Sequence, residues 1–433
     1  MMYKKCILMQ NFLMNSLICM KYLVAFIFIF SLVFYPAMGT FATEKEAPKS
    51  NLEQENFKKW VIEFKKIALK DGKISEQTFD KAFENIKYNP KVIHKDKNQP
   101  EFMETFWTYY KKRLTKQRIM QGINEYKKYT KLLSEIEKKY GVPGQYIIAF
   151  WGLETSYGHY FGNWNVIKSL ALLAYDGRRK HMFERELITA LQILENNKID
   201  IKKMVGSWSG AMGNFQFMPS TYQRYAIDGD GDEIVDMWGS IPDAFNSAAN
   251  YLSKVGWKRD LPWGEEVMIP DDFDWMLIGD YNIKKSKSDW QKLGIKKAFG
   301  EPLDNLAQSG YLLAPQGKSG PVFLLYDNFD IIMKWNLSYN YAILVGMLAD
   351  SIKDPNTKIY ALEVNEELLR QKIAEIQKEL YDMKIYEYKD FRGVLNNKTR
   401  MAIRRYQKEY GLTPDGYPST ETYLHILDKG TIK

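Results

Sequence analysis

Glu154 is a single carboxylate within an apolar, aromatic run, FWGLETSYG at positions 150–158. If this run is helical, the positions three and four residues away hold aromatic rings and a glycine, so no lysine or arginine can pair with Glu154 at helical spacing. Burial among rings would raise the pKa of Glu154 from its usual value of about 4.3 toward the range in which a carboxyl group donates a proton near neutral pH. Glu154 is therefore a candidate general acid; the alternative is an ordinary glutamate that points into solvent at a helix edge.

A second group of carboxylates has the spacing of a loop that binds a hard cation. Asp228, Asp230 and Asp232 occupy alternate positions, as in the first half of a calcium loop. The backbone carbonyl of Ile234 would then stand at the seventh place and Asp236 at the ninth. All of these ligands offer oxygen, so the spacing predicts calcium as a structural ion, and the alternative is an acidic surface turn.

The second half of this loop departs from the calcium pattern. Glu233 stands at the sixth position, where the sharp turn favours glycine, and Gly239 stands at the twelfth, where a bidentate glutamate should close the site. Asp243, a few residues further on, is a substitute for that glutamate. The spacing implies no water-activating geometry, so the ion is expected to brace the structure.

Residues 206–220, GSWSGAMGNFQFMPS, combine small residues, two amide side chains and aromatic rings without any charge. Glycines allow the backbone to approach a ligand or a neighbouring helix closely. This composition suits a groove that binds a neutral, hydroxyl-rich chain. The alternative is a tightly packed corner between two helices.

The composition of the chain excludes some classes of function. The chain has 433 residues, enough for two or three domains, and 15% of them are aromatic. The formal net charge is +8 at pH 7, but lysine and arginine are scattered along the chain, which argues against a nucleic-acid site. The two cysteines, Cys6 and Cys19, both precede the apolar run described next, so we expect no disulfide framework and no thiolate metal site in the mature protein.

The N-terminal residues 1–42 have the pattern of a secretory signal peptide. Lys21 precedes an apolar run over 22–35, and small residues lead to a cleavage site after Ala42 or Ala37, with Met20 as an alternative start. Neither cysteine follows the small residue that a lipoprotein signal requires, so a lipid anchor is not supported. We expect a soluble, exported protein of the periplasm; the alternative is an uncleaved membrane anchor.

The elements around the candidate residues are predicted to be mainly helical. Apolar residues recur at helical spacing up to about position 350, and period-two stretches are few. Gly141 and Pro143 end one helix and begin the next, which carries Glu154. The predicted helices cover residues 56–70, a segment capped by Ser75, much of 101–139, 167–175, 246–256 and 328–349. Short strands are expected in an irregular insertion over about 261–313, and a further strand over 322–325.

The domain boundaries follow from shifts in composition. Residues 43–55 are predicted to be a polar linker, and residues 56–354 the main domain, which ends near the turn at 354–357. Residues 365–433 carry their own apolar pattern, consistent with a small three-helix domain. This tail holds no constellation of titratable residues that suggests chemistry, so binding or packing are its candidate roles.

Several of these motifs together resemble the lytic murein transglycosylase B family. They are WGLET at 151–155, SWSGAMG at 207–213, QFMPS at 216–220 and the run that starts at Asp228, and the resemblance extends from about residue 56 to residue 350. The tail resembles the peptidoglycan-binding domain common in cell-wall enzymes, through 399–407 and 411–416. The resemblance implies a lysozyme-like, goose-type helical catalytic domain that cleaves the bond between N-acetylmuramic acid and N-acetylglucosamine.

The resemblance also implies roles for individual residues. Glu154 matches the family's catalytic acid and base, and a structural calcium ion is implied at Asp228, Asp230, Asp232 and Asp243. Positions that line the family's sugar-binding groove are matched by Ser207, Gln216, Tyr251 and Tyr341. Trp335 falls where the family often has a tyrosine, which leaves stacking on a sugar as its expected role. No cofactor is expected for catalysis, and the expected partners are peptidoglycan glycan strands and other cell-wall enzymes.

The number of carboxylates suggests a mechanism. A glycosidase that uses water usually needs two carboxylates, and no second one accompanies Glu154 in the matched motifs. We therefore expect Glu154 to act first as acid and then as base, so that the C6 hydroxyl of the muramyl residue attacks its own anomeric carbon and leaves a 1,6-anhydromuramyl end. The alternatives are a muramidase that hydrolyses the same bond, or a non-catalytic wall-binding protein.

Overall fold

The computed structural model describes residues 47–97, 104–196, 199–279, 282–364 and 370–428. The predicted signal peptide and both cysteines lie outside these residues. Within the described ranges, no helix combines the length and the apolar character that crossing a bilayer requires. The chain divides into two units after Asn56, and the unit from Phe57 onward contains all of the candidate residues.

The first helices follow the predicted apolar spacing and end at the predicted breaks. Helix α2 (Ala47–Lys70) begins inside the segment predicted to be a linker and ends before the Asp71–Gly72 turn. Ser75 accepts a hydrogen bond from the backbone of Thr78 and so caps α3 (Glu76–Phe83), as expected. Helix α4 covers Pro90–Lys97. The region predicted to be helical over 101–139 consists of three helices, α5 (Phe106–Arg113), α6 (Lys116–Lys128) and α7 (Thr130–Tyr140), because Thr105 and Thr115 each cap a new one.

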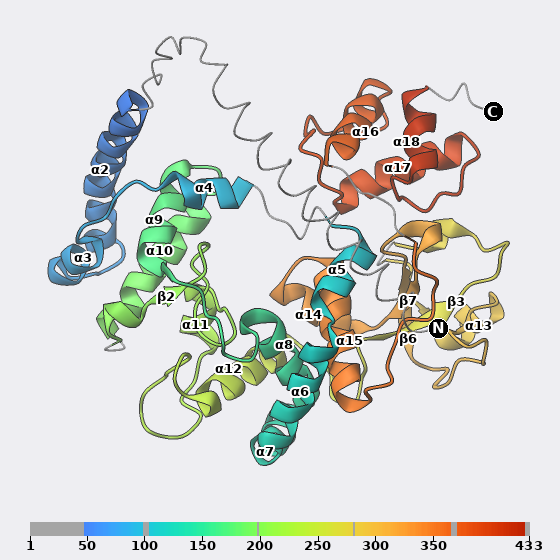
Figure 1. Cartoon of the computed structure of the whole chain (residues 1–433), viewed down its shortest axis with the longest axis horizontal. Helices are drawn as coiled ribbons and strands as arrows, with labels where there is room; N and C mark the ends of the chain where they lie inside the picture. The colour runs from blue at the N-terminus through green and yellow to red at the C-terminus, as the bar shows by residue number, and fades with distance from the viewer. Residues whose placement is uncertain (1–46, 98–103, 197–198, 280–281, 365–369, 429–433) are drawn as a thin grey trace, which may run out of the picture. The chain divides into compact units, whose positions relative to one another are not determined.

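Helix α8 (Gly144–Thr155) is the element around which the main domain is packed. Gly141 in the left-handed conformation ends α7, and Pro143 precedes the first residue of α8, as predicted. Nearly every residue of α8 is buried, because α8 contacts α6, α7, α12 and α15, and Figure 1 shows it among these helices. A helix that is apolar on all sides belongs in a core. Its C-terminal end carries Glu154.

A second group of helices follows α8. This group includes a two-stranded antiparallel sheet of β1 (Trp164–Asn165) and β2 (Val205–Gly206). Its helices are α9 (Val166–Asp176), α10 (Lys180–Asn196), α11 (Pro219–Tyr225) and α12 (Ile241–Lys254), with a 3₁₀ turn at Ile201–Lys203. Helices α9 and α10 pack against each other, and α12 packs on α7, α8 and α11. Between α10 and α12 run the uncharged 206–220 segment and the acidic loop.

The predicted insertion forms a five-stranded antiparallel sheet in the order β4-β6-β7-β3-β5. Its strands are β3 (Gly264–Met268), β4 (Lys285–Ser286), β5 (Lys296–Lys297), β6 (Ser309–Leu313) and β7 (Val322–Leu325), with α13 (Lys287–Lys292) and 3₁₀ turns at Trp275–Leu277 and Gly317–Ser319. The short strands expected here and the strand over 322–325 are confirmed. Trp290 and Leu324 belong to a separate apolar cluster of the insertion.

The helix predicted over 328–349 is two helices, α14 (Asp327–Trp335) and α15 (Tyr339–Lys353). Asn336 is extended and ends α14, while the Ser338 side chain accepts a hydrogen bond from the backbone of Tyr341 and caps α15. The apolar spacing runs through this break, so the sequence pattern did not reveal it. The break places Trp335 at the end of one helix and Tyr341 in the first turn of the next.

The tail forms the predicted three-helix domain, with α16 (Arg370–Asp382), α17 (Asn397–Glu409) and α18 (Thr420–Leu427), which Figure 1 shows grouped together. It has its own apolar cluster, in which Leu380, Tyr406 and Ile426 are fully buried. The predicted fold class is confirmed: a mainly α, lysozyme-like domain with a small β insertion and a helical C-terminal domain.

Candidate functional site

Glu154 receives a hydrogen bond from a residue far away in the sequence. It is the second-last residue of α8, and Ser156, in the left-handed conformation, ends that helix. Glu154 is half-buried, and its Oε1 accepts a hydrogen bond from the hydroxyl of Tyr341 in the first turn of α15. Burial, and then the charge of Glu154, raise the pKa of Tyr341 far above its usual value, so this hydroxyl remains a donor. One carboxylate oxygen is thereby fixed by a neutral donor.

Aromatic rings surround this pair. The ring of Trp335 lies 4.4 Å from that of Phe150, one turn before Glu154 on α8, and 5.1 Å from that of Tyr251 on α12. The ring of Tyr341 lies 6.4 Å from that of Phe150. Trp335 is only partly buried, so part of its surface remains available to a ligand. The structure therefore brings Glu154, Tyr341, Trp335 and Tyr251 into one cluster.

The hydroxyl of Tyr251 has a different partner from that of Tyr341. It donates to the backbone carbonyl of Lys334 at 3.0 Å, and burial raises the pKa of Tyr251 to about 12. This bond ties α12 to the end of α14, next to Trp335. Tyr251 therefore orients the Trp335 segment, and its hydroxyl oxygen can still accept a hydrogen bond.

Ser207 and Gln216 shape the uncharged segment between α10 and α11. Ser207 Oγ accepts a hydrogen bond from the backbone of Ala211 at 3.0 Å. Gln216 adopts the left-handed conformation, with φ of 49°, and its Nε2 donates to the carbonyls of Phe161 and Gly213 at 3.1 and 3.0 Å. Both side chains thus hold the loop in place, in keeping with a tightly packed corner, while Ser207 and Gln216 remain only partly buried.

Asn214 is a site residue that the sequence analysis did not single out. It is 1% exposed, and its Oδ1 accepts a hydrogen bond from Trp151 Nε1 at 2.7 Å. Its backbone carbonyl accepts one from the Thr155 hydroxyl at 2.9 Å, and its Nδ2 donates to the carbonyl of Met237 at 3.0 Å. Asn214 therefore links the residue after Glu154 to the acidic loop. The sequence signal for Asn214 is an amide side chain within an aromatic run, because a buried amide needs hydrogen-bond partners inside the protein.

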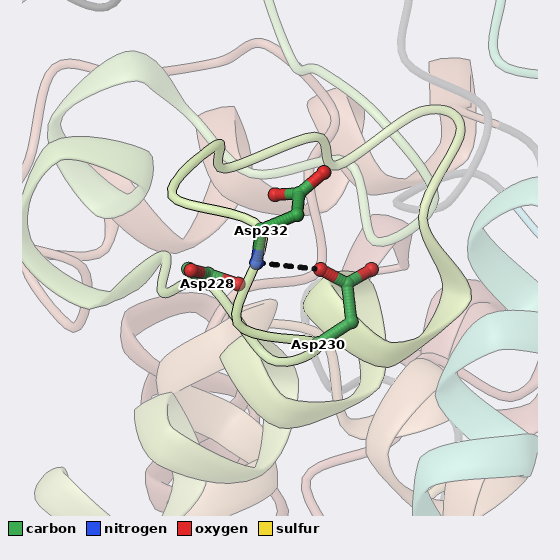
Figure 2. Close-up of side chains that lie close together, drawn as sticks. All are labelled: Asp228, Asp230 and Asp232. Atoms are coloured by element: carbon green, nitrogen blue, oxygen red, sulfur yellow. Dashed lines mark hydrogen bonds between the residues drawn. The ribbon is translucent and has the colours of Figure 1, made fainter.

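Three aspartates of the acidic loop converge, as the alternate spacing predicted. Asp228, Asp230 and Asp232 each offer a carboxylate oxygen, and these atoms all lie within 4.8 Å of one another; Figure 2 shows the three side chains around the turn. The Asp228 carboxylate accepts hydrogen bonds from the backbone of Glu233 at 2.8 Å and of Gly231 at 2.6 Å. These bonds hold the pKa of Asp228 below its usual value. Asp228 therefore stays anionic, and the three converging carboxylates offer oxygen ligands to a hard cation.

Asp243 occupies a different position from these three residues. It is fully buried, its Oδ1 accepts a hydrogen bond from the backbone of Gly229, and its Oδ2 accepts one from the backbone of Asp236, both at 2.7 Å. Burial raises the pKa of Asp243, and the two backbone bonds oppose that rise. Among the described residues, the converging group contains the three exposed or half-buried aspartates, and Asp243 braces the loop that carries them.

The two departures from the calcium pattern have structural explanations. Glu233 adopts the left-handed conformation, with φ of 68°, which is the one that glycine would favour at the sixth position. The backbone of Gly239 donates to Asp236 Oδ1 at 2.8 Å, so Asp236 closes the turn internally. The donor set therefore fits a cation with oxygen ligands, although its last ligand differs from the regular loop.

Two family models match this chain. Residues 56–350 match the family described as transglycosylase SLT domain, and residues 370–426 match the one described as peptidoglycan binding domain. The chain is similar to membrane-bound lytic murein transglycosylase B of Escherichia coli K12, with 30% identity over 249 residues, which are 57% of this chain and 67% of the relative.

Solved structures share the fold. SltB3 from Pseudomonas aeruginosa in complex with NAG-anhNAM-pentapeptide is 39% identical, with a TM-score of 0.80 over 86% of this chain and 99% of that one. The Escherichia coli lytic transglycosylase Slt35 in complex with calcium is 28% identical, with a TM-score of 0.59 over 70% of this chain and 95% of that one.

Proposed function

The chain belongs to the transglycosylase SLT domain family and is a peptidoglycan lytic transglycosylase, and from this premise we propose how it works. It cleaves the β-1,4 bond between N-acetylmuramic acid and N-acetylglucosamine and leaves a 1,6-anhydromuramyl end. Glu154 acts alone, first as acid and then as base. The observation that carries this proposal is the hydrogen bond from Tyr341 to Glu154 within a cluster of aromatic rings.

In the first step, the carboxylic acid of Glu154 donates its proton to the glycosidic oxygen while the bond from that oxygen to the anomeric carbon breaks. The partly exposed ring of Trp335 offers a face on which a sugar can stack. Tyr341 donates a hydrogen bond to one oxygen of Glu154 and so helps to fix the position of the carboxyl group that carries the proton. General acid catalysis of this kind contributes a factor of about 10² to 10⁴ in rate.

In the second step, the Glu154 carboxylate removes the proton from the C6 hydroxyl of the muramyl residue. The freed oxygen bonds to the anomeric carbon of the same sugar, so no water is consumed and Glu154 ends in its starting state. The nucleophile is part of the substrate and is already close to the reacting carbon, which lowers the entropic cost of attack. The absence of a second carboxylate from the motifs at 151–155, 207–213 and 216–220 supports this route over hydrolysis.

The substrate class is supported by the muropeptides bound in two SltB3 complexes, NAG-anhNAM-pentapeptide and NAG-NAM-pentapeptide. We propose Ser207, Gln216, Tyr251, Trp335 and Tyr341 as the residues that contact the sugars. Tyr341 contacts Glu154 itself and Trp335 packs on Phe150, one turn before it, while Ser207 and Gln216 shape the loop between α10 and α11.

Mass spectrometry of sacculi digested by the full chain tests this function. The expected products carry anhydromuramyl ends, which are lighter by one water than hydrolysed ends. Hydrated reducing ends would instead identify a muramidase. Release of the same products by the Glu154→Gln variant would overturn the role of Glu154.

We also propose that Asp228, Asp230 and Asp232 hold a structural calcium ion, as supported by their converging oxygens and by the calcium complex of Slt35. Asp243 keeps the loop in a shape that can receive the ion. The ion would supply positive charge that offsets the mutual repulsion of the three carboxylates. Isothermal titration of the metal-free chain should give one calcium site, and Asp230→Asn should abolish it. Unchanged binding by that variant would place the ion elsewhere.

We further propose that the tail anchors the enzyme to the wall and that the chain is exported to the periplasm. The tail matches a peptidoglycan binding domain and folds around its own core, which supports an anchoring role. Deleting residues 365–433 should weaken binding to sacculi more than it slows turnover of a short soluble glycan. Equal losses in both assays would argue against a separate anchor.

A further inference from the structure

A cavity of about 200 Å³ lies where the main domain meets the tail. Its walls come from the start of α5, the segment 337–340 that leads into α15, and the N-terminal half of α17 with the turn before it. This volume is below the about 300–1,000 Å³ of sites for drug-sized ligands, so it suits one terminal residue of a chain better than a disaccharide.

The junction around this cavity is built from specific contacts. Arg400 Nη2 on α17 donates to the carbonyl of Pro315 at 2.8 Å, and the backbone of Lys318 donates to Asp415 Oδ2 at 2.9 Å. Lys318 also forms an ion pair with Glu421 at 2.8 Å. Both parts of the chain therefore contribute backbone and side-chain groups to the walls.

Arg400 brings a positive charge to the cavity wall that the described residues do not neutralise. Its Nε is buried without a hydrogen-bond partner among them, and none of their carboxylates lies within ion-pair distance. The nearby Asp415 is engaged elsewhere, because its oxygens accept hydrogen bonds from Gln407 and from the backbone of Tyr417 and Lys318. Burial lowers the pKa of Arg400, yet an arginine keeps its charge in proteins.

Glu104, the carboxylate in the cavity wall, does not supply the missing anion. It forms ion pairs with Lys112 at 2.7 Å and with Arg113 at 2.6 Å. These partners hold the pKa of Glu104 below its usual value despite its partial burial. Among the described residues, the guanidinium of Arg400 therefore has no anionic partner, and a carboxylate brought by a ligand would supply one.

The cavity adjoins the reacting centre through one short stretch of chain. Trp335 and Tyr341, which lie on either side of the segment 337–340, belong to the Glu154 cluster, whereas the segment itself forms a wall of the cavity. The glycan strand that reaches Glu154 is uncharged apart from its peptide stems, which branch from muramic acid and carry carboxylates. Charge complementarity therefore points to the stem and not to the sugars.

We propose that this junction cavity binds a carboxylate of the peptide stem, with Arg400 as its cationic partner and the tail as one of its walls. The proposal rests on the proposed function, because it assigns part of the same substrate to the cavity. It gives the tail a second role, in which α17 helps to select strands that still carry stems.

Binding to the Glu154→Gln chain tests this inference without turnover. The probes are two glycan oligomers of equal length, with and without peptide stems, and the quantity measured is the ratio of their dissociation constants. We expect the stem to strengthen binding about tenfold, as a charge-assisted hydrogen bond does, and Arg400→Gln to bring the ratio near one. Arg405→Gln is the matched control, since Arg405 is exposed on the same helix and should keep the ratio.

Two further measurements separate recognition from a structural role of Arg400. A stem with amidated carboxylates should lose its advantage with Arg400 intact. Asn340→Asp, which adds a negative charge to the wall and keeps the bond from Arg400 to Pro315, should lower the ratio if Arg400→Gln does not fold. A ratio that survives Arg400→Gln, or an amidated stem that binds equally well, would overturn the inference. Free stem peptide has no glycosidic bond, so its binding to the wild-type chain is readable even if Glu154 is not the catalytic acid.

Discussion

The surroundings of Glu154 and of the acidic loop are opposite, although Asn214 forms hydrogen bonds with Thr155, next to Glu154, and with Met237, just beyond the loop. Glu154 stands among aromatic rings and accepts a hydrogen bond from Tyr341, 187 residues away. The Asp228 carboxylate is satisfied by backbone N–H groups three and five residues further along the chain. Burial among aromatic rings favours the neutral form of a carboxyl group, whereas hydrogen bonds from backbone N–H groups favour the ionised form. This contrast is consistent with the proposed roles, which are proton transfer for the first region and ion binding for the second.

The comparison is tested most strongly by Glu154→Gln, which keeps the shape of the side chain and removes its proton chemistry. We expect the rate of release of muropeptides to fall about 10³-fold, because both steps use this group. The melting temperature should change little. Glu135→Gln, an exposed glutamate on the neighbouring α7, is the control and should retain the wild-type rate. Comparable losses in the two variants would contradict a special role for Glu154.

Asp350, a half-buried carboxylate outside the proposed site residues, is a third case that sharpens the comparison. It lies on α15, two turns beyond Tyr341, and accepts a hydrogen bond from Trp263 Nε1 at 2.8 Å. Burial raises the pKa of Asp350 from 3.8 to about 6. Between these two values the folded state therefore binds more protons than the unfolded state. As a result, the contribution of Asp350 to the free energy of unfolding is greatest below pH 3.8 and is lost as the pH rises through about 6.

The size of this effect is about 3 kcal/mol for a shift of about two pKa units. Denaturant unfolding at pH 5 and pH 7.5 should show roughly 1.4 kcal/mol of it, because much of the change already occurs between pH 3.8 and pH 5, and Asp350→Asn should flatten the difference between the two. If the variant keeps the wild-type pH dependence of unfolding, then Asp350 is ionised in the folded protein at little cost.

Local sequence patterns predicted the parts of the site but not how they meet. The apolar run around Glu154, the glycine and proline before α8 and the alternating aspartates each act over a few residues, and each formed as expected. The break at 336–338 was missed because apolar spacing continues through it, and only the extended Asn336 and the Ser338 cap reveal it. The bonds from Tyr341 to Glu154 and from Asn214 to Trp151 join distant segments, which no local pattern encodes.

Tyr341→Phe removes only the hydroxyl that distinguishes the Glu154 site. A hydrogen bond to a charged group contributes about 2 kcal/mol, so we expect the turnover rate to fall about 30-fold while the affinity for glycan changes less. Tyr157→Phe is the matched control, because its buried hydroxyl donates to the backbone carbonyl of Arg118 at 2.7 Å. That variant should lose stability but keep its rate. A normal rate in Tyr341→Phe would show that the ring alone is needed.

The smallest expected effect concerns the acidic loop, where calcium should change stability more than chemistry. At about ten times its dissociation constant, a bound ion adds about 1.4 kcal/mol, which should raise the melting temperature by a few degrees. The low pKa of Asp228 means that this carboxylate stays ionised, and so available to the ion, at mildly acidic pH. Asp230→Asn should abolish the shift in melting temperature, whereas Asp272→Asn, on a turn of the insertion, should keep it.

Removal of calcium by a chelator should slow turnover only modestly, because the loop reaches Thr155 indirectly, through the hydrogen bonds of Asn214. A loss as large as that of Glu154→Gln would mean that the two regions are one site, and would break the comparison.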